Sequence, residues 1–274
     1  MPGILLRIPY IQNKVSEVAT TQLSGHLGVP VKIGNVDIEW FNRLVLEGLY
    51  LEDQDGKVMF EANHVAAGFE IMPLLEGKFV FTTVRLFGFS FNLRKHTPES
   101  PLNLQFVIDA FASKDSIKKE KNIDLRFNSI MIRRGNFSYN VDSEKETPGK
   151  FNAKHIDIKN LSAKISLKAF NKDAHIKKMS FDEASGFSLN KLSLNVVGNR
   201  DSAFVQDFEV RLPQTNLKIG RARIDLSEID SLPALLNNAP IDLNITPSQI
   251  CLKDLSPFVP AFKNFADTIE LSAE

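Results

Sequence analysis

Apolar and polar residues alternate with a period of two through most of this chain. Ile123-Asp124-Leu125-Arg126-Phe127 and Leu192-Ser193-Leu194-Asn195-Val196 are two such runs. A strand of this kind has one apolar and one hydrated face, which is typical of antiparallel sheets. Asp55-Gly56, between two strand-like segments, predicts a hairpin turn. The chain is therefore expected to be mainly β, with an antiparallel β-sheet.

A short pattern centred on a glycine occurs twice. In Leu44–Leu51 and in Val84–Phe91, two alternating apolar residues precede Gly48 or Gly88, and two more follow it. A glycine at this place fits a β-bulge, which re-aims the strand. The segment Ile130–Tyr139 is a looser third copy. Repeated units favour an extended architecture in which each unit leans on its neighbours.

Apolar residues at helical spacing predict a helix over residues 10–27, followed by Gly28 and Pro30 as a stop signal. We expect this helix to cover the first edge of the sheet through Ile11, Val15 and Val18, because an open edge invites aggregation. A second helix is predicted over 102–113, with shorter helical turns at 73–76 and 228–237.

The first nine residues form a separate segment. Ile4-Leu5-Leu6-Arg7-Ile8 is too short to cross a bilayer, and we interpret residues 1–9 as the remnant of a membrane anchor. The polar breaks further on do not resemble flexible linkers, so residues 10–274 are expected to form one elongated domain. A new alternating run begins at Thr268, which suggests a piece of a longer protein.

Composition and motifs argue against several function classes. The 33 basic residues equal the 33 acidic ones, which disfavours a nucleic-acid partner. No nucleophile–base motif, phosphate-binding glycine loop or metal-ligand spacing occurs, so no catalytic, cofactor or metal residues are predicted. Glu52–Gly56 could hold Ca²⁺, although a solvated turn is the simpler interpretation. Arg133-Arg134 could contact an anion or form a solvated pair.

Phenylalanine dominates the aromatic residues. There are 21 Phe, three Tyr and one Trp, and a Phe ring has no polar group to offer a ligand. This balance suggests apolar surfaces, either in a closed core or on an open face. A sandwich covers such a face with a second sheet, whereas an open, U-shaped sheet needs an apolar ligand against it. The alternation leaves both possibilities open.

Six segments, in order and spacing, resemble the N-terminal region of TamB-like proteins of the Bacteroidetes type, within the AsmA-like group. The resemblance covers nearly the whole chain and is strongest over residues 8–112. The segments are Ile8–Gln12, Leu27–Gly34, Leu49–Gln54, Pro73–Lys78, Val84–Gly88 and Asn103–Phe111.

The resemblance implies a protein anchored in the inner membrane by one N-terminal helix and extending across the periplasm. Such proteins resemble long, curled β-sheets with an apolar groove and are linked to phospholipid transport and outer-membrane protein assembly. The resemblance thus implies that the antiparallel β-sheet of this chain is elongated and curled. We expect a non-enzymatic bridge for phospholipid acyl chains, with an outer-membrane assembly protein as a further partner of the full-length protein. The alternatives are a chaperone that pairs nascent strands with an exposed sheet edge, and a purely structural β-sandwich.

The repeated glycines predict which residues would line such a groove. Because each glycine shifts the alternation by one residue, apolar positions on both sides of it can share one face. The same residues would also suit a closed core. The predicted groove residues are Leu44, Leu46, Leu49, Leu51, Val84, Leu86, Phe89 and Phe91.

Overall fold

The computed structural model describes residues 9–39, 42–70, 72, 79–111, 123–167, 172–199, 201–226 and 241–273. The chain divides into two compact units, Met1–Glu144 and Lys145–Glu274, and each is described by itself. Both units consist mainly of long strands in an open sheet, and the N-terminal helix is present, which confirms the predicted fold class. That residues 10–274 form one domain stays a prediction, and the turns at 73–76 and 228–237 lie outside the described residues.

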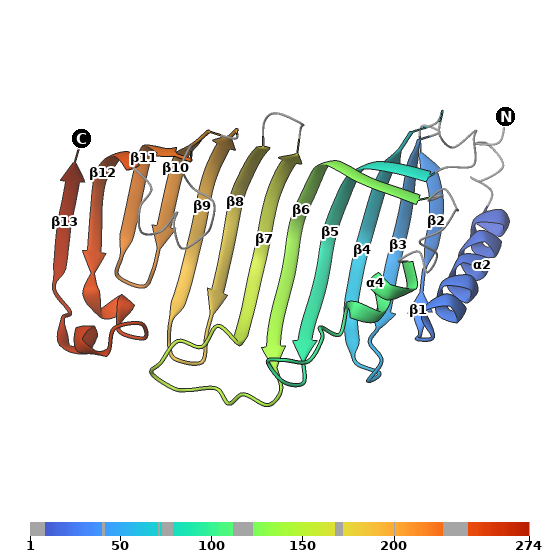
Figure 1. Ribbon diagram of the computed structural model, residues 1–274, viewed down its shortest axis with the longest axis horizontal. Coiled ribbons are helices and arrows are strands. Elements are labelled where there is room, and N and C mark those ends of the chain that lie inside the picture. Colours follow the sequence, from blue (N-terminus) through green and yellow to red (C-terminus); the bar gives the residue numbers. More distant parts are fainter. Residues whose placement is uncertain are drawn as a thin grey trace. The chain divides into compact units, whose positions relative to one another are not determined.

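Unit 1 contains a helix, the first six strands and a short second helix. Both β1 and β2 pair with β3, and the order continues through β4 and β5 to β6. In Figure 1, β5 and β6 bend at their upper ends, so this sheet is curled. The elements are α2 (Pro9–Leu27), β1 (Val31–Lys32), β2 (Asn35–Glu39), β3 (Arg43–Glu52), β4 (Val58–Phe69), β5 (Phe79–Lys95), α4 (Gln105–Phe111) and β6 (Ile123–Val141).

One strand pair in unit 1 departs from the expected antiparallel arrangement. Strands β5 and β6 run parallel, with Val84 beside Ile130 and Phe91 beside Phe137. A parallel pair needs a long crossover, and residues 96–122 supply it. The crossover contains α4, which is the predicted helix over 102–113 in a shorter form.

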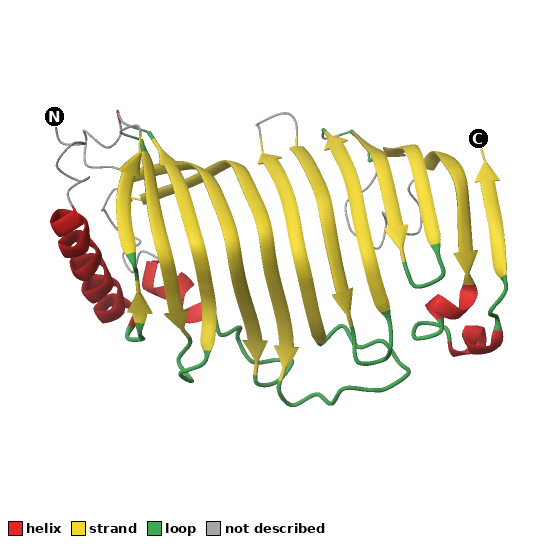
Figure 2. Ribbon diagram, turned by 180° about the vertical axis from the view of Figure 1, so that it is seen from behind, coloured by secondary structure: helices red, strands yellow, loops and turns green. Residues whose placement is uncertain are grey.

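Unit 2 is a run of antiparallel strands, each paired with its neighbour in sequence (Figure 2). Two short 3₁₀ helices, η1 and η2, connect its last two strands. The elements are β7 (His155–Leu167), β8 (Lys172–Asp182), β9 (Ser188–Gly198), β10 (Ser202–Arg211), β11 (Asn216–Asp225), β12 (Ile241–Cys251), η1 (Leu252–Leu255), η2 (Pro260–Asn264) and β13 (Thr268–Ala273).

The predicted stop signal ends α2. Gly28 has a φ of 69°, the left-handed conformation that glycine adopts without steric cost after a helix. Its backbone N–H donates to the carbonyl oxygen of Ser24 at 2.9 Å. The chain then turns back into β1, which brings the helix beside the first strands of the sheet.

Candidate functional site

One face of the sheet in unit 1 is apolar from β3 to β6. Directly opposite residues share a face, and two apolar ladders cross these strands. The β3 members of both ladders pack in one hydrophobic cluster, so both ladders lie on the same face. The first ladder is Leu46, Val65, Leu86 and Ile132, and the second is Leu51, Phe60, Phe91 and Phe137.

A row of five residues, which we call the kink row, separates the two ladders. Left-handed backbone occurs in three of its members, with φ of 61°, 59° and 53° at Gly48, Gly88 and Arg134. The register between β3, β4 and β5 is unchanged across the row, so these strands kink together and no single strand bulges. Leu44, Leu46, Leu49 and Leu51 consequently share a face, as the glycine pattern predicted. The kink row is Gly34, Gly48, Asn63, Gly88 and Arg134.

The four predicted groove residues of β3 are half-buried beside a hydrophobic cluster at the edge of the sheet. They pack against Val31, Ile33 and Val36, each less than 9% exposed. The helical members of this cluster are Ala19, Leu23 and Leu27. At β3 the apolar face is therefore half-buried against the cluster at the sheet edge.

Helix α2 also closes the edge of the sheet through hydroxyl groups. The Oγ of Ser24 accepts a hydrogen bond from the backbone N–H of Val31 at 3.0 Å and donates to the Val31 carbonyl at 3.3 Å. The Oγ1 of Thr20 accepts one from the N–H of Ile33 at 3.2 Å. These contacts occupy backbone groups of Val31 in β1 and of Ile33 just after it, so they protect an edge that could otherwise pair with another strand.

The structure corrects the predicted composition of this cap. Val18 is 59% exposed and faces away from the cluster, because Ala19, one residue on, occupies the packed stripe. The side chains of Ile11 and Val15 lie outside the described part of the chain. The sequence pattern located the helix correctly, and its apolar stripe also contained Ala19, Leu23 and Leu27, which pack as expected, so the correction concerns Val18 alone.

The predicted groove residues of β5 have two different environments. Val84, Leu86 and Phe91 are half-buried. Phe89 is only 5% exposed, and its ring stacks on Phe60 with centroids 6.1 Å apart. Two further ring pairs, Phe60 with Phe91 at 5.6 Å and Phe91 with Phe137 at 6.0 Å, extend this packing to β6.

Unit 2 has an apolar face of the same kind. A ladder of Ala174, Val196, Val205 and Ala222 crosses β8 to β11, and a second one contains Met179, Leu192, Val210 and Leu217. Leu192 and Val196 share a face because they are four residues apart in regular alternation. In β10, Asp207 has a φ of 51° and marks a register shift between the two ladders, and Asn160 in β7 has a φ of 55°.

In unit 2, aromatic side chains also pack on one side of the register shift in β10. Phe187, Leu189 and Leu212 form a buried cluster, to which η1 contributes Leu255. The ring of Phe187 contacts three others, with centroid distances of 5.8, 5.5 and 4.9 Å to Phe151, Phe181 and Phe258. The ladder on the other side, from Ala174 to Val205, consists of half-buried aliphatic side chains.

The predicted acidic turn is part of a charged cluster in unit 1. Asp53 is 2% exposed and accepts backbone hydrogen bonds from Asp55 and Lys57, which fixes the hairpin turn. Arg94, at the end of β5, contacts the Asp53 carboxylate at 3.0 Å. Asn103, in the crossover, donates to the same carboxylate at 3.0 Å. The cluster thus joins the β3–β4 turn, β5 and the crossover, and it gives the acidic run a structural role.

Hydrogen bonds and charge lower the pKa of Asp53 despite its burial. Burial alone would raise this pKa, because it disfavours the charged form. The hydrogen bond from Asn103, those from the backbone of Lys57 and Asp55, and the charge of Arg94 outweigh that effect. In unit 2, hydrogen bonds from Lys191 and Arg211 lower the pKa of Glu209.

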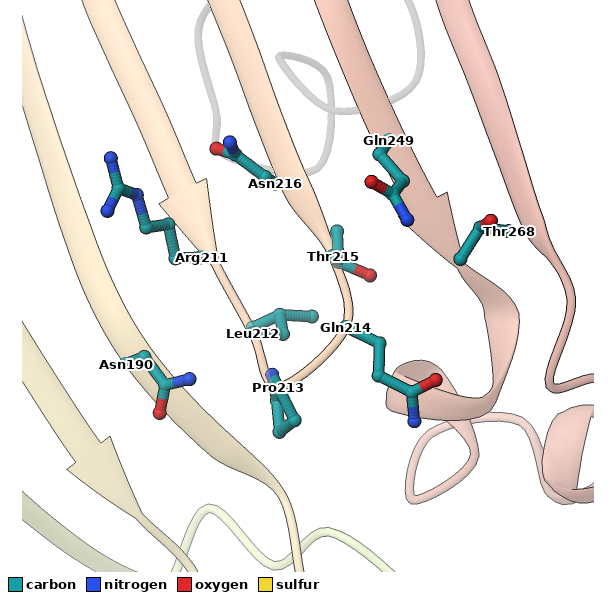
Figure 3. A pocket seen from close by; sticks show the side chains of 9 residues that line it. All are labelled: Asn190, Arg211, Leu212, Pro213, Gln214, Thr215, Asn216, Gln249 and Thr268. Atoms are coloured by element: carbon teal, nitrogen blue, oxygen red, sulfur yellow. The ribbon is translucent and has the colours of Figure 1, made fainter.

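Two open hollows lie elsewhere on the sheets. One, of about 450 Å³, lies along the kink row and includes Tyr50, Glu61 and Arg134 in its lining. Arg134, predicted as half of a solvated or anion-binding pair, lies over the ring of Phe87 with its Cζ 5.4 Å from the centroid. The other hollow, of about 590 Å³, lies at the β10–β11 turn. In Figure 3 its nine side chains spread along the strand ends and do not converge on one point.

Within the described ranges, no three His, Cys, Asp or Glu residues are grouped so that they could hold a metal ion. Over the same part of the chain, no helix has the length and apolar character to span a bilayer. Comparison with protein families gave no matching family, and comparison with curated proteins gave no match.

Proposed function

We propose that this chain is a non-enzymatic part of a periplasmic bridge that carries phospholipid acyl chains along an apolar sheet face between inner and outer membranes. The observation that carries the proposal is the ladder of Ala174, Val196 and Val205, whose aliphatic side chains are half-buried on an open sheet. Apolar surface against water costs about 25 cal/mol per Å², so an apolar ligand would stabilise this face. The envelope location and the membrane anchor come from the TamB-like resemblance.

The described residues give no support for the second layer that the sandwich alternative requires. Within each unit, all described strands belong to one sheet, and no described strand forms a second sheet packed on its apolar face. The aromatic clusters and α2 cover only parts of that face. An open face with a ligand is therefore the better explanation of the half-buried ladders.

The proposal is tested with a pair of neighbouring substitutions in β10. Val205 lies on the apolar ladder, whereas Gln206 is exposed on the opposite face. The full chain and the variants Val205→Asp and Gln206→Asp are purified from cell envelopes without harsh detergent, and bound lipid is measured by mass spectrometry. We expect phospholipid on the wild type and on Gln206→Asp but far less on Val205→Asp, with similar melting temperatures. A wild type free of acyl lipid would refute the proposal.

A scaffold for outer-membrane protein assembly is the second candidate. All six residues of β13 are exposed, and the only described strand that it pairs with is β12. An extended segment of another protein could add to such an edge. Hydrogen exchange that slows in β13 when an unfolded outer-membrane protein is added would favour this function, and unchanged exchange would count against it.

A further inference from the structure

Each apolar face is divided into two bands with different side chains. We define the aliphatic band as Val65, Ala67, Val84, Leu86, Ile130 and Ile132 in unit 1 and Ala174, Ile176, Leu194, Val196, Val205 and Ala222 in unit 2. The aromatic band is Phe60, Phe89, Phe91 and Phe137 in unit 1 and Phe151, Phe181, Phe187 and Phe258 in unit 2.

We propose that the acyl chains lie on the aliphatic band and that the aromatic band is protein core. This inference rests on the proposed function and assigns its ligand to particular residues. It changes the predicted groove, because Phe89 and Phe91 then belong to the core and Val84 and Leu86 to the ligand site.

The aromatic band has a buried ring at its centre in each unit. In unit 1 Phe89 is 5% exposed between Phe60 and the backbone of Gly135. In unit 2 Phe187 is 8% exposed, and the ring of Phe258 packs on Phe151 with centroids 4.5 Å apart. The contacts bury the two central rings, Phe89 and Phe187, whereas Phe258 is 47% exposed and the other five aromatic side chains are half-buried. A hydrocarbon chain could reach the two central rings only by displacing their ring contacts.

The aliphatic band has no large buried side chain. Eleven of its twelve members are half-buried, and the exception, Ala222, is 5% exposed. Alanine at positions 67, 174 and 222 keeps the surface low beside the larger Val, Leu and Ile side chains. From β8 to β11 the band spans about 14 Å, since neighbouring strands lie about 4.8 Å apart. Such a shallow aliphatic strip suits a hydrocarbon chain that lies across the strands.

The aliphatic strip of unit 1 continues onto strand β3, next to the hydrophobic cluster at the sheet edge. Leu44 and Leu46 continue the band of unit 1 opposite Ala67 and Val65. There, Ala19, Leu23 and Leu27 of α2 lie in the same cluster as these leucines. The aliphatic side chains of the helix thus pack at the β1–β2 edge, against the same cluster that these leucines contact.

The test uses tryptophan fluorescence in one strand. Trp40, the only tryptophan, is replaced by Phe, and a new tryptophan is introduced in β8 as Ile176→Trp, Phe181→Trp or Lys177→Trp. These positions report on the aliphatic band, the aromatic band and the polar face. Each full-length variant is incubated with phosphatidylethanolamine vesicles whose acyl chains carry bromine, a short-range quencher, and with unbrominated vesicles. Circular dichroism confirms that each variant is folded.

We expect several-fold stronger quenching at Ile176→Trp than at Phe181→Trp, with almost none at Lys177→Trp. Equal or stronger quenching at Phe181→Trp would overturn the assignment to the aliphatic band and leave the proposed function intact. If no position is quenched and the wild type carries no lipid after incubation, the proposed function itself fails.

Discussion

The ring of Phe89 in β5 lies against the backbone of Gly135, its neighbour in the parallel strand β6. A Cβ atom at position 135 would overlap the edge of this ring, whose face stacks on Phe60. Position 135 thus requires a glycine because the ring of Phe89 approaches its backbone closely. In Ile130–Tyr139, the third copy of the glycine-centred pattern, the left-handed backbone occurs at Arg134, the residue before Gly135.

Gly135→Ala should therefore destabilise unit 1. Overpacking of this kind costs about 1–3 kcal/mol, because the ring or the strand must move. Urea denaturation monitored by circular dichroism measures the change. Gly25→Ala is the matched control, since nothing lies within 4 Å of an added Cβ in that helical position, and it should be neutral or slightly stabilising. Equal stability of Gly135→Ala and the wild type would contradict the contact.

Phe89→Glu and Leu86→Glu should differ strongly although both residues lie on the apolar face of β5. The first places a carboxylate in a 5% exposed site, which costs several kcal/mol and should unfold unit 1. The second places it in the half-buried aliphatic band, where it can reach water, so the fold should survive. Thermal melts compare the two variants. A well-folded Phe89→Glu protein would show that the aromatic band is open.

Arg94→Met should cost about 3–5 kcal/mol, because it leaves the buried carboxylate of Asp53 without its cation. Arg211→Met provides the control. Its guanidinium also contacts a carboxylate, that of Glu209, but the side chain is 51% exposed, and such pairs contribute less than about 1 kcal/mol. Chemical denaturation of both variants gives the comparison, and similar losses would argue against a special role for the buried pair.

Protonation of Asp53 at acidic pH should lower the stability of the fold. Because its pKa is lower in the folded chain than the ordinary value of 3.8, its contribution is complete above that value and is lost as pH falls through the folded pKa. Melting temperatures between neutral and strongly acidic pH should show this loss. Asp53→Asn cannot titrate, so its melting temperature should be lower at neutral pH and decline less on acidification. An identical dependence of melting temperature on pH for the variant and the wild type would exclude Asp53 as a source of the stability lost in acid.

The double substitution Thr20→Val and Ser24→Ala should loosen the edge of β1. Each lost hydrogen bond contributes about 0.5–1.5 kcal/mol, and the amides of Val31 and Ile33 should exchange faster with deuterium. Thr21→Val is the control, because the Oγ1 of Thr21 donates within the helix to the Glu17 carbonyl. Val18→Asp should also be tolerated, since Val18 is 59% exposed. Unchanged exchange in the double variant would show that α2 does not protect this edge.

The sequence by itself determined the local features of this protein. Period-two alternation specified the strands, and Gly48 and Gly88 marked two kinks, because a left-handed backbone is without steric cost only for glycine. The Asp55-Gly56 turn and the stop of α2 at Gly28 follow from the same property. Each of these signals lies within a few residues of the structure that it specifies.

Only the tertiary structure decided the features that join distant residues. Arg134 adopts the left-handed backbone although its residue type does not favour it, so the strands around it impose this conformation, whereas Asn160 and Asp207 are of types that tolerate it but seldom signal it alone. The pairing of Asp53 with Arg94 depends on a register that joins residues 41 apart. Alternation placed Phe89 and Leu86 alike on the apolar face. Only the stacking of Phe60 and the approach of Gly135 bury one and leave the other half-exposed, because burial depends on what packs over a residue.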